Sequence, residues 1–340
     1  MTKFRSKAPL RLGLAGGGSD LDTYCNKYGG YVLNSTISLY VHCTIEVTDD
    51  GFTEFDSLDN GQNFRDKSVE YIAYNGHMDL FKAVYNRVVK DYFKKPMSVK
   101  VTTYSDVPSG SGLGGSSTLV VAILGALTEW LNLPLGEYDL AKIAYEIERE
   151  DVGVVGGAQD MYAAAFGGFN FMEFYDNKRV IVNPLRIKSS IIDELEDSLL
   201  LFFTKITRGA SQIEDEKKSL LSNSSSLNAM HEVKNDAILM KEYLLKGQLK
   251  KFAEVLGRSW ISKKRVSNNI TNQSIDTIFN SACKHGAYSG KLSGAGGGGF
   301  MFLFVDPVKK YNLSKYLRDK GDVYDFKFVK DGVKSWKVYD

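Results

Sequence analysis

The hydrophobic and polar positions of this chain predict a mixture of strands and helices. In the first half, β-branched and aromatic residues favour strands over residues 4–14, 31–48 and 98–104. Apolar residues at helical spacing favour four helices, over residues 71–93, 116–131, 138–150 and 157–166. The helix over 116–131 is apolar almost all round, which predicts that it is buried.

The second half continues the mixture in a different order. It predicts a strand over 199–203, helices over 209–222, 227–245, 248–257 and 271–285, a strand over 300–305, a helix over 309–319 and strands around 323–338. This pattern is typical of the α+β class. At roughly 150 residues per domain, the 340 residues suggest two domains. Pro184 lies in a boundary region, so we expect domains over 1–184 and 185–340.

The composition narrows the class of protein. Hydrophobic residues make up 43% and charged residues 25%, which are ordinary globular values, and the net charge is +2. Such a balance excludes a protein built mainly to coat nucleic acid. The longest apolar stretch, residues 119–127, is far shorter than the roughly 20 residues that span a bilayer. Three widely spaced cysteines without zinc-ligand spacing fit a reducing compartment, so we expect a cytoplasmic protein without a membrane partner.

A glycine-rich loop over residues 108–115 lies between a predicted strand and the buried helix. Its four glycines allow close backbone approach and positive φ angles, and free N–H groups at the helix start favour an anion. The hydroxyls of Ser116 and Ser117 could bond a phosphate or hold a magnesium ion. The alternative is a tight turn into a core helix, which rarely needs so many glycines. We therefore predict a phosphate-binding loop.

The same loop matches the pattern GxGxxG, which alone is weak evidence. A dinucleotide site should show an acidic residue after the next strand, about 20 residues on, and position 130 is still inside the helix. The loop also lacks the Gly-Lys-Ser/Thr of a Walker A motif, and the chain has no HRD catalytic loop. These absences exclude a Walker A protein and a protein kinase.

Two acidic residues stand out as candidates for chemistry. Glu148 lies on an amphipathic helix, where acids are usually solvated. Asp160 opens a helix of small residues between glycines and aromatics, so its carboxylate should be partly buried and should need a partner. Carboxylates bind Mg²⁺ together with substrate phosphates, and a carboxylate near an attacking hydroxyl can act as a base in phosphoryl transfer.

Two further glycine runs are candidate parts of the same site. The run over residues 294–299 leads directly into an apolar strand and is too glycine-rich for an ordinary hairpin loop, which favours a backbone nest near a ligand. The turn over residues 16–20 is similar and ends in Asp20. Arg11 precedes this turn on the strand, and beside an acidic base it could stabilise transferring charge.

Taken together, these motifs resemble the GHMP kinase superfamily, named for galactokinase, homoserine, mevalonate and phosphomevalonate kinases. The resemblance spans most of the chain, and the motifs over residues 8–20, 108–117, 148–160 and 293–299 follow in the family's order. It implies a two-domain α+β fold, with an N-terminal domain like domain 2 of ribosomal protein S5 and a ferredoxin-like C-terminal domain. Within the superfamily, residues 9–20 and 158–168 are most similar to kinases of D-glycero-D-manno-heptose 7-phosphate.

The resemblance also implies roles for individual residues. Asp160 would orient or deprotonate the sugar hydroxyl with Arg11 beside it, and Ser116 and Glu148 would hold Mg²⁺. The ATP phosphates would lie on Pro108, Gly110, Ser111, Gly112, Leu113, Gly114, Gly115, Ser116 and Ser117. The sugar would contact Gly17, Gly18, Ser19, Asp20, Arg208, Gly296 and Gly297. Gly115 replaces a serine common in the family's loop, so Ser117 is a second candidate ligand for the metal.

The resemblance implies phosphorylation of the C1 hydroxyl, in a route to nucleotide-activated heptose for bacterial surface polysaccharide. Arg208, with Lys205 or Lys291, is our hypothesis for the group that binds the distal phosphate, against ordinary surface charge. A superfamily kinase for fucose or galactose is the first alternative. A dinucleotide-dependent oxidoreductase or an inactive nucleotide-binding regulator is the second. The expected partners are ATP and a small sugar phosphate, and a homodimer is left open.

Overall fold

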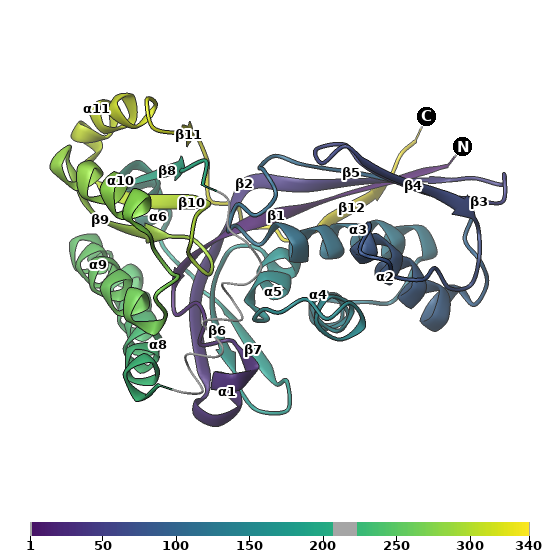
Figure 1. The fold of residues 1–340 in the computed structure, drawn as a ribbon, viewed down its shortest axis with the longest axis horizontal. Helices are drawn as coiled ribbons and strands as arrows, with labels where there is room; N and C mark the ends of the chain where they lie inside the picture. Colours follow the sequence, from purple (N-terminus) through teal and green to yellow (C-terminus); the bar gives the residue numbers. More distant parts are fainter. Residues whose placement is uncertain (1, 207–222, 340) are drawn as a thin grey trace.

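Two antiparallel-rich sheets organise the protein in a computed structural model that describes residues 2–206 and 223–339 (Figure 1). The larger sheet runs in the order β12-β1-β2-β5-β3-β4, and β6 pairs with β2 and with β7. Its strands are β1 (Lys3–Ala15), β2 (Gly30–Val47), β3 (Phe52–Ser57), β4 (Gln62–Lys67), β5 (Val99–Ser105), β6 (Phe169–Phe174), β7 (Val180–Pro184) and β12 (Lys334–Lys337). The strands predicted over 4–14, 31–48 and 98–104 are therefore confirmed.

Helices cover one face of the larger sheet (Figure 1). They are α2 (Asp79–Val88), α3 (Gly115–Leu131), α4 (Glu137–Tyr145) and α5 (Gln159–Phe166), and the π-helical segments η1 (Val89–Phe93) and η2 (Glu146–Asp151) extend α2 and α4. The short helix α1 (Asp22–Tyr28) follows the turn after β1. The apolar residues of α3 from Val120 to Leu127 are all buried, which confirms that this helix lies in the core.

The smaller sheet has the order β11-β8-β10-β9. Its strands are β8 (Leu199–Phe203), β9 (Ala287–Leu292), β10 (Phe300–Val305) and β11 (Asp322–Tyr324). The helices of this half are α6 (Ser189–Ser198), α8 (Ser224–Leu245), α9 (Leu249–Val266), α10 (Gln273–Lys284) and α11 (Pro307–Leu317). In chain order this gives strand, helices, two strands, helix and strand, which is the β-α-β-β-α-β order of a ferredoxin-like domain.

Strand β8 explains why residues 199–203 form an unbroken apolar run. Leu199 and Leu201 pack into the large core cluster, whereas Leu200 and Phe202 pack into a second cluster with Trp260. A strand that is buried on both faces has no position for a polar side chain.

Two of the predicted helices have different bounds in the structure, and a third lies outside the described residues. The helix predicted over 71–93 begins only at Asp79, because the Asp79 carboxylate accepts the backbone N–H groups of Asn75 and Gly76 and closes a turn there. The helix predicted over 248–257 continues to Val266. The helix predicted over 209–222 lies outside the described residues.

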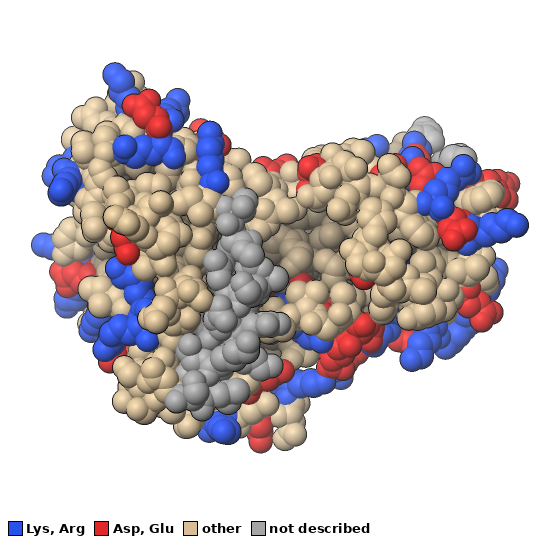
Figure 2. Space-filling model, in the orientation of Figure 1, with Lys and Arg blue, Asp and Glu red and all other residues tan. Residues whose placement is uncertain are grey.

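The chain crosses between its two halves more than once. β12, near the C-terminus, pairs with residues Phe4–Lys7 of β1, and α8 packs against β2. The domain boundary near residue 184 stays a prediction, since the last strand of the second half belongs to the sheet of the first. Figure 2 shows one face of the molecule, which is hollowed between the two lobes where uncharged side chains predominate.

Candidate active site

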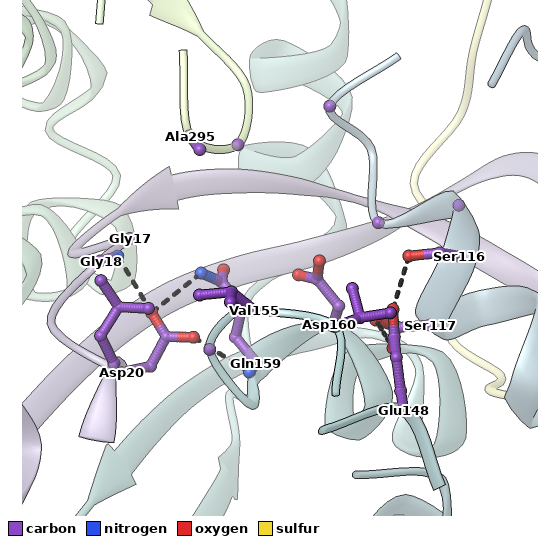
Figure 3. Close-up of a pocket in the computed structure, with 18 of the residues that line it drawn as sticks. Gly17, Gly18, Asp20, Ser116, Ser117, Glu148, Val155, Gln159, Asp160 and Ala295 are labelled. Carbon is purple, nitrogen blue, oxygen red and sulfur yellow. Dashed lines mark hydrogen bonds between the residues drawn. The ribbon is translucent and has the colours of Figure 1, made fainter. Parts of the chain in front are cut away.

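A cavity of about 500 Å³ gathers the predicted motifs from both halves of the chain. Figure 3 shows the acidic residues along one wall, with Ser116 at one end, Asp20 at the other and Ala295 opposite. The wall contains most of the residues predicted for the site: Arg11, Gly17, Gly18, Asp20, Gly110, Ser111, Gly112, Gly114, Gly115, Ser116, Ser117, Glu148 and Asp160.

The glycine-rich loop has the backbone that an anion site requires. Gly110, Gly112 and Gly114 all have positive φ angles, between 73° and 82°. Gly114 is the N-cap of α3, and no described side chain caps this helix, so its first N–H groups face the cavity uncapped. A Cβ on Gly114 would lie 3.1 Å from the Asp160 carboxyl carbon. The loop thus brings the positive end of a 17-residue helix next to a carboxylate.

Glu148 lies in η2 and is completely buried, contrary to the solvated position that is usual for such an acid. Its two oxygens accept hydrogen bonds from the hydroxyls of Ser116, at 2.7 Å, and Ser117, at 2.6 Å. The Arg149 guanidinium lies 3.2 Å from the same carboxylate. A buried carboxylate needs such partners. Here the two serine hydroxyls connect the Glu148 carboxylate to the N-terminus of α3.

These oxygens fit a magnesium ion. Mg²⁺ prefers hard oxygen ligands and usually takes one or two carboxylates, with substrate phosphates and water completing its shell. The Ser116 hydroxyl and the Glu148 carboxylate supply two such oxygens at the end of the glycine-rich loop. Within the described residues, no three His, Cys, Asp or Glu side chains cluster as a metal site, so a metal here would depend on the phosphates.

Arg11 and Asp160 form a tight pair. The Arg11 Nε and Nη2 atoms lie 2.7 and 2.6 Å from Asp160 Oδ1. The Arg11 Nη1 atom donates to the carbonyl of Gly112 at 2.7 Å and to the Ser293 hydroxyl at 3.2 Å. The Arg11 side chain is only 4% exposed, whereas that of Asp160 is 19% exposed. The guanidinium therefore fixes Asp160 and both glycine loops, and the carboxylate keeps access to the cavity.

Asp20 is a second buried carboxylate in the wall. It accepts hydrogen bonds from the backbone N–H of Gly18, at 2.9 Å, and from the backbone and side chain of Gln159, at 3.1 and 3.2 Å. Burial raises the pKa of Asp20 above its ordinary value, the backbone hydrogen bonds oppose this, and the nearby charge of Asp160 adds to it. A Cβ on Gly157 would lie 1.9 Å from Asp20 Oδ2, so only glycine permits this approach.

The cavity wall includes a cation that the sequence analysis missed. Lys263, near the end of α9, is 3% exposed, and its ammonium donates to the carbonyl of Gly17 at 3.0 Å. Within Lys263-Lys264-Arg265 it resembles an exposed basic helix end. Its helical spacing from Phe252 and Leu256, both buried, was the signal that could have revealed it.

Several predicted residues lie elsewhere. Five of them are outside the cavity lining: Pro108, Leu113, Ser19, Gly296 and Gly297. The Ser19 hydroxyl instead ties the turn to β2 through Tyr31, and the Gly297 N–H donates to the carbonyl of Ile270 at 2.8 Å. From this run, Gly294 and Ala295 face the cavity instead. The roles given to all of these residues stay predictions.

Two of the cations proposed for the distal phosphate, Lys205 and Lys291, are also outside the cavity lining. Lys205 pairs with Asp322 at 2.9 Å on the exposed surface, and Lys291 is buried within β9. Arg208 lies outside the described residues.

Comparison with known proteins assigns this chain to a protein family. The GHMP kinases N terminal domain matches residues 79–168, and the GHMP kinases C terminal domain matches residues 240–323. The chain belongs to the GHMP kinase family. This confirms the resemblance and the two-part α+β fold, and it argues against the oxidoreductase alternative. GHMP kinases use ATP, which agrees with a glycine loop at a helix N-terminus.

Several relatives of this GHMP kinase are named as sugar kinases. A D-glycero-α-D-manno-heptose 7-phosphate kinase from Campylobacter jejuni is 60% identical over 99% of this chain and 100% of its own. A solved structure of a D-glycero-D-manno-heptose 1-phosphate kinase from Bacteroides thetaiotaomicron is 46% identical over 99% of this chain and 100% of its own, with a TM-score of 0.85. Galactokinase from Lactococcus lactis, at 18% identity over 98% of this chain and 95% of its own and a TM-score of 0.78, shares the fold.

Proposed function

We propose that this GHMP kinase transfers the γ-phosphoryl group of ATP to the C1 hydroxyl of D-glycero-D-manno-heptose 7-phosphate, giving the 1,7-bisphosphate. The observation that carries the proposal is the order of groups along the cavity wall. Along this wall lie, in order, the glycine-rich loop, Glu148, Asp160 and Asp20 (Figure 3). A nucleotide phosphate at the first end and a sugar at the other would therefore meet at Asp160.

Asp160 would accept the proton of the attacking hydroxyl. The sugar oxygen forms a bond to the γ-phosphorus, the bond to the β,γ-bridging oxygen breaks, and ADP leaves. Arg11 holds Asp160 through two nitrogens, and its remaining nitrogen binds the Gly112 carbonyl, so the base and the phosphate loop keep a fixed distance. The N–H groups at the start of α3 would stabilise the charge of the phosphates.

Magnesium would bind at Ser116 and Glu148 and, when bound, would neutralise charge on the β- and γ-phosphate oxygens. Ser117 shares the same carboxylate, so loss of one hydroxyl leaves the other in place. At the opposite end, the Asp20 carboxylate would accept hydrogen bonds from sugar hydroxyls.

The heptose substrate rests on the 60% identity over nearly the whole chain. The names of the two heptose kinase relatives differ in the position of the sugar phosphate. The product would supply nucleotide-activated heptose for surface polysaccharide, and the reaction would take place in the cytoplasm. No described helix is long and apolar enough to cross a membrane.

A coupled ADP-release assay over a panel of sugars tests the proposal. The panel contains heptose 7-phosphate, heptose 1-phosphate, free heptose, fucose and galactose, each with ATP and Mg²⁺. We expect heptose 7-phosphate to give the highest kcat/KM. Activity on free fucose or galactose without activity on any heptose phosphate would favour the alternative of a different sugar kinase.

A further inference from the structure

The side chain of Gln159 has a fixed orientation in the cavity wall. Gln159 begins α5 directly before Asp160 and is 8% exposed. Its Nε2 atom donates to Asp20 Oδ1 at 3.2 Å, and its backbone N–H donates to Asp20 Oδ2 at 3.1 Å. An ionised carboxylate only accepts hydrogen bonds, so the amide nitrogen must face Asp20. The amide oxygen is thereby turned away from Asp20.

The amide oxygen of Gln159 is buried and accepts no hydrogen bond from any described residue. Buried acceptors are normally paired, because an unpaired one loses its hydration without compensation. The nearest strand supplies no hydrogen bond to it: β1 carries Gly13 at this point, where a Cβ would lie 3.6 Å from Gln159 Oε1. The Arg11 Nη1 atom, 4.0 Å from the same Cβ position, donates to the Gly112 carbonyl and the Ser293 hydroxyl instead. In Figure 3 the amide lies between Asp20 and Asp160, within the cavity wall.

We propose that Gln159 recognises a hydroxyl of the acceptor sugar, with its Oε1 atom accepting the hydrogen bond while Nε2 stays on Asp20. A sugar hydroxyl is a donor of the required kind, and Gln159 lies in the cavity wall between Asp20 and Asp160, the two carboxylates proposed to meet the sugar. The inference rests on the proposed function, because it takes the cavity ligand to be a sugar. It makes Gln159 a specificity-determining residue in addition to Asp20 and Asp160.

A site that binds a hydroxyl rejects an analogue without it, because the site's own polar group is then left unpaired. The test therefore combines changes in the enzyme with changes in the sugar. The full chain, a Gln159→Met variant and a control variant are assayed with the best substrate of the panel and with its series of monodeoxy analogues, by coupled ADP release.

Asn170 supplies the matched control. Its amide is fully buried, its Oδ1 atom also has no partner among the described residues, and its Nδ2 atom donates to the Gly167 carbonyl at 2.9 Å. It is absent from the cavity lining. An Asn170→Leu variant thus removes a buried amide of the same kind without touching the proposed contact.

We expect one deoxy analogue to lose about tenfold in kcat/KM with the wild-type chain and with Asn170→Leu, and less than about twofold with Gln159→Met. If each deoxy analogue loses the same factor in kcat/KM with the wild-type chain and with Gln159→Met, the proposal is overturned and Gln159 Oε1 is satisfied by water alone. Turnover of each sugar by the wild-type chain tests the proposed substrate separately from the role of Gln159. If heptose phosphates fail and another sugar is turned over, the proposed substrate falls, and the deoxy series of that sugar still tests Gln159.

Discussion

At the scale of single residues, the proposed chemistry depends on the ion pair of Arg11 and Asp160. Asp160→Asn keeps the size of the side chain but removes the proton acceptor. We expect kcat to fall by about 10²–10⁴-fold, while the affinity for ATP stays within about twofold, because the contacts proposed for the nucleotide lie on the glycine-rich loop and α3. Steady-state assays and calorimetric titration with ATP measure the two quantities. Asp319→Asn, on the surface, is the control, and near-normal turnover by Asp160→Asn would mean that positioning alone suffices.

The raised pKa of Asp20 predicts an acidic limit to activity. Because burial favours the protonated form, this carboxyl takes up a proton at a higher pH than the ordinary value of 3.8. Protonation would remove the acceptor that we propose for the sugar hydroxyls, so kcat/KM for the sugar should fall as the pH decreases through that pKa. The kcat/KM profile for the sugar, compared with that of Asp20→Asn, measures this. A wild-type profile that stays flat down to pH 4 would contradict the role given to Asp20.

Lys263 is a cavity cation that contacts the turn over residues 16–20 through the Gly17 carbonyl, and we expect it to contribute to binding of the sugar's phosphate. Lys263→Met should raise KM for the phosphorylated sugar about tenfold or more and leave KM for ATP unchanged, because a hydrogen bond between charged groups is lost. Lys264→Met is the matched control, since Lys264 points to Asp276 at 3.4 Å instead. An increase in KM for ATP alone would place Lys263 at the nucleotide.

At the scale of elements, the two glycine loops are packed backbone against backbone. The Phe300 N–H donates to the carbonyl of Ser111 at 2.8 Å, and a Cβ on Gly299 would lie 2.2 Å from that same oxygen. A Cβ on Gly112 would lie 2.6 Å from the carbonyl of Ser293. Much of the glycine content that suggested a ligand nest therefore serves the junction between the loops.

Gly299→Ala tests this junction. The φ angle of Gly299 is +85° and the added methyl group meets backbone, so we expect a loss of about 1–3 kcal/mol in stability. Gly51→Ala is the control, because Gly51 also has a positive φ, of +77°, but nothing lies within 4 Å of its Cβ position. Thermal and urea unfolding of both variants measure the difference. Equal destabilisation would show that the close contact adds nothing to the backbone strain.

The elements that the sequence could predict are those with a strong hydrophobic pattern. The buried α3, the two-faced β8 and the long strands β1 and β2 were found with near-correct ends. The hairpin of β3 and β4 was missed, because β4 is exposed along nearly its whole length and its polar sequence carries no alternation. Motif spacing also suggested the phosphate loop and its acids. The burial of Glu148, however, depends on hydroxyls 31 and 32 residues away along the chain.

At the scale of the whole molecule, the hairpin of β1 and β2 extends along both lobes and brings their loops to one cavity (Figure 1). Arg11 on β1 contacts the phosphate loop, α5 and the second glycine run, so the site exists only when both halves are folded together. Contacts between residues as far apart as Arg11 and Ser293 leave no local signal, and the contact of Gln159 with Asp20 is of the same long-range kind, which is why Gln159 was not predicted as part of the site. Lys263 carried only the helical spacing from buried residues of α9.

The position of the new phosphate in the product is the sharpest test of the proposed reaction. The full chain is incubated with ATP, Mg²⁺ and heptose 7-phosphate, and the product is examined by proton and phosphorus NMR. We expect a second phosphate on C1, seen as phosphorus coupling to the anomeric proton, with one ADP released per sugar. A product phosphorylated at any other carbon, or ADP release without a phosphorylated sugar, would contradict it.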